Sequence, residues 1–157
     1  MRATPFSRPM LIALYAIGVL AVSIWSDLAF AGHTDLLRSP LPTAITLVFG
    51  AIVGDTAVSA EEAVFARRGL WPTAWPLFAL RVMAMSAGWV MLGHLLTPAV
   101  AMLVQIPRAG FEILPTIALG LEFALRQALL PALVVGVVVG SVVGLTFIRR
   151  ASAQARA

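Results

Sequence analysis

The chain has 157 residues, of which 61% are hydrophobic and 11% are charged, whereas a water-soluble domain carries about 25% charged residues. It therefore has too few polar side chains to cover a surface in water, and the composition predicts an all-α integral membrane protein surrounded by the lipid bilayer. The net charge of +4 arises from 11 basic residues, all Arg, which flank apolar segments instead of alternating with aromatic residues, so nucleic acid is not an expected partner.

Four segments are long enough to cross a bilayer. A spanning helix needs roughly 20 mostly apolar residues, and this criterion predicts transmembrane helices over residues 10–31, 42–65, 80–104 and 127–148. The connections between them are too short to hold a soluble domain. We therefore expect a single transmembrane domain over residues 1–157, ending in a basic tail at 149–157.

The arginines predict the orientation of these helices. With a cytoplasmic N-terminus, eight of them fall on the inner side: Arg2, Arg8, Arg67, Arg68, Arg81, Arg149, Arg150 and Arg156. Only Arg38, Arg108 and Arg126 fall on the outer side. This asymmetry predicts that both termini are cytoplasmic. Because an Arg-only, Ala-rich composition is typical of GC-rich bacteria, we expect a multi-pass protein of the bacterial inner membrane.

The first segment has a second interpretation. Arg2 and Arg8, the apolar run after them and the sequence Ala29-Phe30-Ala31 resemble the parts of a cleaved secretory signal peptide. The long apolar run, and Asp27 just before the cleavage motif, favour a retained first transmembrane helix. An intact mass distinguishes the two.

The segment before the fourth helix is also ambiguous. Pro107 and Pro115 mark turns, and Glu122 and Arg126 have the i,i+4 spacing of a helix-stabilising ion pair. These features predict an amphipathic helix over residues 112–126 at the outer membrane surface. The alternative is one long tilted helix that continues through the fourth span, with Pro131 as its kink.

Small residues form a stripe along the fourth helix. Gly136, Gly140 and Gly144 recur every fourth position after Ala132. Because apolar side chains gain little by leaving lipid, membrane helices associate through close packing, and glycines at this spacing allow two backbones to approach. The stripe therefore predicts a tight helix–helix contact. Its partner stays open between the second helix, another copy of the chain and a different protein.

Ionisable groups occur at intramembrane positions, where they are costly and suggest function. Asp55, Ser59 and Glu62 share one stripe of the second helix, and His94 lies within the third. Counted at 1.5 Å per residue from the inner ends, Asp55 and His94 both lie about 15–20 Å deep, so they are expected to be able to pair. Such a pair can carry a proton or bind a cation, or can simply hold two helices together.

A second polar cluster is expected at the cytoplasmic surface. It contains Glu61, Arg67, Arg68 and Arg81. Such a cluster is either a solvated face with loose ion pairs or a docking site for a cytoplasmic partner.

No signature of catalysis occurs in the chain. It has no zinc-protease, nucleophile-elbow or P-loop motif and no Cys for thiol or metal chemistry. His33 and His94 differ in depth by about 15 Å, so they are not expected to share a haem, and no cofactor or metal is predicted. The leading hypothesis is a small non-enzymatic subunit or scaffold that assembles through the glycine-striped helix as a homo-oligomer or within a larger membrane complex. The alternative is a small oligomeric transporter or channel for protons, ions or a small solute that uses Asp55 and His94.

Overall fold

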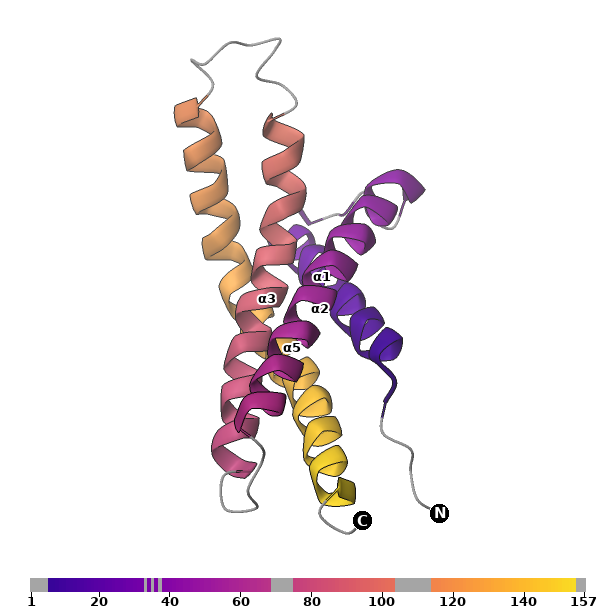
Figure 1. The fold of residues 1–157 in the computed structure, drawn as a ribbon. Helices are drawn as coiled ribbons and strands as arrows, with labels where there is room; N and C mark the ends of the chain where they lie inside the picture. Colours follow the sequence, from indigo (N-terminus) through magenta and orange to yellow (C-terminus); the bar gives the residue numbers. More distant parts are fainter. Residues whose placement is uncertain are drawn as a thin grey trace.

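The structure is a computed structural model that describes residues 6–154 except His33, Asp35, Leu37, residues 69–74 and residues 104–113. This part of the chain forms four α-helices (Figure 1): α1 (Arg8–Ala31), α2 (Pro40–Arg68), α3 (Trp75–Leu103) and α5 (Leu114–Gln154). Each is long and apolar enough to cross a membrane. The chain is thus an all-helical protein with four candidate spans.

Local sequence explains where α1 begins and ends. Pro9 occupies its first turn, where the missing N–H of proline costs nothing and its fixed φ suits a helix. Gly32 follows the last residue with a φ of 69°, the left-handed conformation in which glycine commonly ends a helix. The first predicted span, 10–31, therefore differs from α1 by only two residues.

Helix α5 differs from the separate interfacial helix predicted over residues 112–126. It runs without interruption for 41 residues from Leu114 to Gln154, with Pro131 inside it. Leu119, Leu125 and Leu129 are all exposed, so this part has no broad polar face that would hold it at the membrane surface. Proline is also tolerated within transmembrane helices because the freed backbone groups find other partners. The alternative of one long helix describes the structure, although the predicted Glu122–Arg126 pair forms, at 2.6 Å.

The four helices form two closely packed hairpins, α1 with α2 and α3 with α5. The glycine stripe of α5 lies against α3. A Cβ added at Gly136 would overlap the backbone of Ala87, and one added at Gly140 would overlap that of Met83. The stripe is thus occupied by a helix of the same chain, and this helix is α3 and not α2. Ala132, next in the row, is fully buried in the core.

A second glycine pair joins α1 and α2. A Cβ on Gly50 would lie 2.7 Å from Ala16 Cα, and one on Gly54 would lie 2.7 Å from Tyr15 Cβ. Real Cβ atoms essentially never approach other atoms so closely, so these positions require glycine for the same reason as the stripe of α5. This contact was not predicted from the sequence, although Gly50 and Gly54 have the same four-residue spacing as the glycines of α5.

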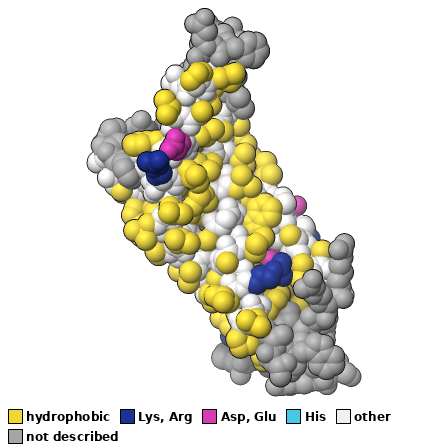
Figure 2. Space-filling view, turned by 90° about the vertical axis from the view of Figure 1, so that its left-hand side faces the viewer, with side chains coloured by type: hydrophobic (Ala, Val, Ile, Leu, Met, Phe, Trp, Pro, Cys, Tyr) yellow, Lys and Arg dark blue, Asp and Glu magenta, His cyan; other side chains and the backbone are white. Residues whose placement is uncertain are grey.

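Hydrophobic side chains cover the outside as well as the core. Figure 2 shows a face occupied largely by hydrophobic side chains, with only isolated charged groups. Large apolar residues such as Leu77, Leu80, Leu130 and Val138 are exposed on the helices. Such a surface suits a helix bundle in lipid, because the chain lacks the polar groups that water would demand.

The close contact of α3 and α5 makes Gly140→Ala a test of this packing. The added methyl group must push backbone apart, and overpacking of this kind typically costs about 1–3 kcal/mol. Gly88→Ala is the matched control, because nothing lies within 4 Å of its added Cβ and alanine is the better helix former. Unfolding in detergent, monitored by circular dichroism, should show a lower free energy of unfolding for Gly140→Ala only. Equal stabilities of the two variants would contradict the contact.

Candidate functional site

Polar side chains gather at two levels of the bundle. One group, the charged layer, consists of Arg8, Asp55, Ser59, Glu62 and Arg150, beside the pair Glu61 and Arg81. It lies where α1 begins and α5 ends, the lower end in Figure 1, and there Arg150 donates a hydrogen bond of 2.9 Å to the Phe6 carbonyl. The other group lines a cavity nearer the opposite end.

Arg8 is the centre of the charged layer. Its Nη2 lies 2.6 Å from Asp55 Oδ1 and donates to Ser59 Oγ at 2.7 Å, while its Nη1 lies 2.7 Å from Glu62 Oε2. Because these three residues of α2 stand at i, i+4 and i+7, they form one stripe, and that stripe meets the first turn of α1. Arg150 approaches the second oxygen of Glu62 at 3.6 Å. Three helices are therefore tied together at this end.

The Asp55–His94 pair predicted from helix depth is not formed. The Asp55 carboxylate is bound by Arg8, whereas the His94 ring is hydrogen-bonded to Ser23 of α1. Counting residues from a helix end gives depth but not the direction in which a side chain points about the helix axis. In addition, Arg8 was interpreted only as a signal of orientation. An arginine at the membrane edge is, however, a ready partner for an intramembrane carboxylate.

The expected cytoplasmic docking cluster is only partly a surface feature. Glu61 is 2% exposed, and its Oε1 lies 3.3 Å from Arg81 Nη2. Its Oε2 has no hydrogen-bond partner in the part of the chain that is described. Glu61 is therefore an interior group and not a docking residue. The side chains of Arg67 and Arg68 lie outside the described residues.

Helices α1 and α3 run parallel and in register between the two levels. Tyr15 Oη and Ser86 Oγ are 2.7 Å apart, and Ser23 Oγ lies 2.9 Å from His94 Nδ1. In both pairs, the residue of α3 comes 71 positions after its partner in α1. Val19 and Val90, which share this offset, are fully buried one turn from each pair. A single apolar layer therefore separates the Tyr15–Ser86 pair from His94.

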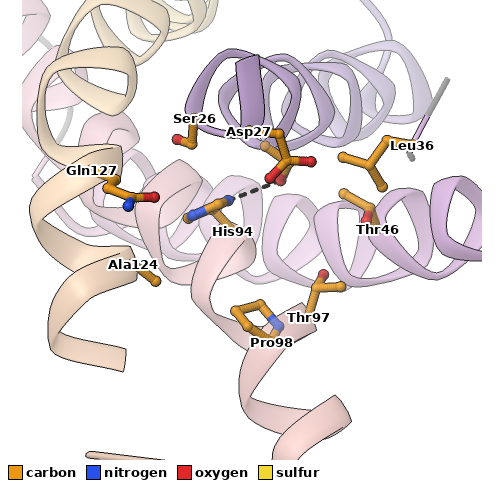
Figure 3. A pocket seen from close by; sticks show the side chains of 10 residues that line it. Ser26, Asp27, Leu36, Thr46, His94, Thr97, Pro98, Ala124 and Gln127 are labelled. Carbon is orange, nitrogen blue, oxygen red and sulfur yellow. Dashed lines mark hydrogen bonds between the residues drawn. The ribbon is translucent and has the colours of Figure 1, made fainter. Parts of the chain in front are cut away.

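Beyond this apolar layer lies a cavity of about 250 Å³ to which all four helices contribute. It is lined by Ser23, Ser26, Asp27, Leu36, Thr46, His94, Thr97, Pro98, Ala124 and Gln127. Figure 3 shows His94 of α3 between Gln127 of α5 and Asp27 of α1, with Thr97 and Pro98 one turn further along α3. This group of residues is called the polar cavity below.

Ser23 links the His94 ring to α1. Its hydroxyl donates to the Val19 carbonyl at 3.0 Å, and its oxygen lies 2.9 Å from His94 Nδ1. With the single hydroxyl proton donated to Val19, the oxygen accepts from Nδ1–H, and the Nε2 of neutral His94 is then an acceptor. No described residue donates a hydrogen bond to Nε2.

Three buried polar atoms of the cavity lack partners among the described residues. They are Ser26 Oγ, Thr97 Oγ1 and Gln127 Nε2. An unsatisfied buried polar group typically costs about 1–3 kcal/mol, and buried polar groups in proteins are usually paired with protein or ordered water. Asp27 is already partly engaged, because its Oδ2 accepts a 2.8 Å hydrogen bond from Thr34. The unpaired atoms around one cavity give it unused hydrogen-bonding capacity for a bound molecule.

Among the residues of the polar cavity, only His94 was predicted from the sequence as a candidate site residue. Asp27 was interpreted only in relation to signal-peptide cleavage, and Ser26, Thr97 and Gln127 were not predicted. A signal was available for part of the set, because Ser23, Ser26 and Asp27 stand at i, i+3 and i+4 of an apolar helix and so share a face. The contributions from α3 and α5 required the tertiary structure.

The charged layer predicts a specific pattern of variant stabilities. Arg8→Gln removes the cation that binds both the Asp55 and the Glu62 carboxylates, so unfolding in nanodiscs should occur at a lower temperature. The double variant Arg8→Gln/Asp55→Asn should recover part of the loss, because one uncompensated charge is gone. Arg126→Gln, which breaks the exposed pair with Glu122, should have little effect. A double variant no more stable than Arg8→Gln would contradict this role of the ion pair.

Comparisons with protein-family models, with curated proteins and with solved structures find no match to this chain. No relative therefore supplies a function for either polar group. The chemistry of the polar cavity and of the charged layer is the remaining basis for one.

Proposed function

We propose that the protein is a small membrane transporter that binds a small polar solute in the polar cavity. The observation that carries this proposal is the cluster of three unpaired buried polar atoms, Ser26 Oγ, Thr97 Oγ1 and Gln127 Nε2, around one cavity beside His94. Polar residues that serve only to hold helices together pair with each other. These atoms do not, which favours a ligand that pairs with them.

The layers of the bundle support a closed state of such a transporter. Val19 and Val90 separate the polar cavity from the Tyr15–Ser86 pair, so a solute cannot pass without movement of α1 relative to α3. The charged layer ties α1, α2 and α5 together at the far end. Opening is therefore proposed to begin at the cavity end, with the charged layer as the fixed end.

The proposed setting is a bacterial inner membrane with both termini cytoplasmic. The distribution of the arginines supports this orientation, and Arg8, Arg81 and Arg150 all belong to the end that it makes cytoplasmic. The polar cavity then lies towards the periplasmic side. At 1.5 Å per residue, His94 stands about 20 Å along α3 from Arg81.

The second candidate is a subunit that assembles through its glycine-striped helix. Gly136 and Gly140 are covered by α3 of the same chain, so the stripe is not free to bind a partner. Purification in native nanodiscs separates this hypothesis from the proposed one. A stoichiometric foreign protein would favour the subunit, whereas a protein isolated alone that moves a solute would favour the transporter.

Thr97→Val tests the transporter directly. The variant keeps the shape of the side chain but removes a buried hydroxyl without a partner, so stability should be unchanged or higher by about 1 kcal/mol. Transport should fall, because a ligand-binding group is lost. Proteoliposomes exposed to osmotic gradients of glycerol, urea, ethylammonium or acetate report entry of each solute by light scattering.

Thr56→Val is the matched control for that experiment. Thr56 is exposed on α2 and donates only to the backbone oxygen of Ile52, far from the cavity lining. It should change neither transport nor stability appreciably. Absence of flux for every probe in the parent protein, or equal flux in Thr97→Val, would reject the proposed function.

A further inference from the structure

We propose that the ligand of the polar cavity is a small organic cation with a primary ammonium group, and that Asp27 is its counter-charge. This inference rests on the proposed function, since it names the class of solute that the same cavity would bind. It is carried by the charge of the lining residues, the direction of their hydrogen bonds and the volume available.

Asp27 gives the cavity a negative charge. It is the only acidic or basic residue, His94 aside, among the described residues of the lining. Arg126, next to the lining residue Gln127, points outward with 77% of its side chain exposed and is paired with Glu122. Arg81 belongs to the charged layer, about 20 Å away along α3. An anionic ligand would therefore meet an unneutralised carboxylate in a low-dielectric region, where charge repulsion is strong.

Most polar atoms of the lining can accept a hydrogen bond, whereas Gln127 Nε2, which has no partner among the described residues, is a donor. In the tautomer in which His94 Nδ1 donates to Ser23, its Nε2 offers a lone pair. The Asp27 carboxylate accepts only, and the Ser26 and Thr97 hydroxyls can each accept as well as donate. A primary ammonium group carries three N–H donors and no acceptor, like the lysine ammonium. It therefore complements this lining better than a neutral alcohol, which has a single donor.

The unpartnered Ser26 hydroxyl independently points to a ligand. Its side chain is 2% exposed, it lines the cavity, and its Oγ has no partner among the described residues. Ser26 immediately precedes Asp27, so the neutral acceptor and the carboxylate enter the cavity from the same turn of α1. A cation held by Asp27 would bring donors close to this oxygen.

The volume indicates which size of cation fits the cavity best. A cavity of about 250 Å³ lies below the usual range of about 300–1,000 Å³ for sites of drug-sized ligands. The cavity therefore suits an amine of a few heavy atoms better than a large amphipathic cation.

Equilibrium binding to the full chain in nanodiscs tests the inference separately from transport. Ethylammonium, ethanol and acetate share a two-carbon skeleton and differ chiefly in their charge and in the number of hydrogen-bond donors. Ligands this small bind weakly, with a Kd on the order of millimolar at best, which suits saturation-transfer NMR. We expect ethylammonium to bind at least about ten-fold more tightly than ethanol, and acetate to show no saturable binding.

Asp27→Asn and Asp55→Asn form a matched pair of variants. Asparagine at position 27 can still accept the hydrogen bond from Thr34, so the fold should be retained, and circular dichroism checks this. The variant should lose the preference for ethylammonium over ethanol. Asp55→Asn makes the same chemical change in the charged layer and should keep that preference.

Equal binding of the three probes, no binding of any of them, or an unchanged preference in Asp27→Asn would overturn the inference. Asp27→Glu provides a second check if Asp27→Asn proves unstable, because retention of charge should retain the preference. Selective binding of ethylammonium without flux would support the ligand class but reject the transporter. Flux of glycerol or acetate in preference to ethylammonium would support the transporter but reject the ligand class.

Discussion

Direct backbone contact between helices is the constraint on which the rest of this structure depends. In lipid, apolar side chains gain little from leaving their surroundings, so close packing must hold the bundle together. Gly136 and Gly140 bring α5 onto the backbone of α3, and Gly50 and Gly54 bring α2 onto α1. Within each hairpin, these contacts fix the register of the two helices. The polar groups can then be placed accurately because the helices that carry them are placed accurately.

The relation between the two hairpins creates the functional geometry. Helices α1 and α3 run parallel with a constant offset of 71 residues. Polar residues of α1 therefore lie level with polar residues of α3, and apolar residues lie level with apolar residues. Tyr15 meets Ser86, and Ser23 meets His94, with one buried apolar level of Val19 and Val90 between them. A shift of a single turn would pair hydroxyls with valines and leave the imidazole without Ser23. Polar groups buried in a membrane bundle thus also specify its register.

The two polar groups differ in how completely they are satisfied. In the charged layer, Arg8 binds two carboxylates and a hydroxyl, and of the buried charged-group atoms in and beside this layer only Glu61 Oε2 has no partner among the described residues. In the polar cavity, Ser26, Thr97 and Gln127 each retain an unpaired buried atom. A satisfied network mainly stabilises, whereas unused hydrogen-bonding capacity around a cavity favours a ligand. This difference, and not the number of charges, is the basis for proposing a binding role for the polar cavity and a structural role for the charged layer.

The sequence by itself determined the class of protein and the number of candidate spans, because both depend on apolar length, which is a local property. It also determined that glycines such as Gly136 and Gly140 require a close contact, and it included both interpretations of residues 112–126. It did not determine which helix meets the glycines, that Asp55 pairs with Arg8, or that His94 meets Ser23. Those facts depend on rotation about each helix axis and on the register between helices. Both result from packing between residues distant in sequence, so only the tertiary structure decided them.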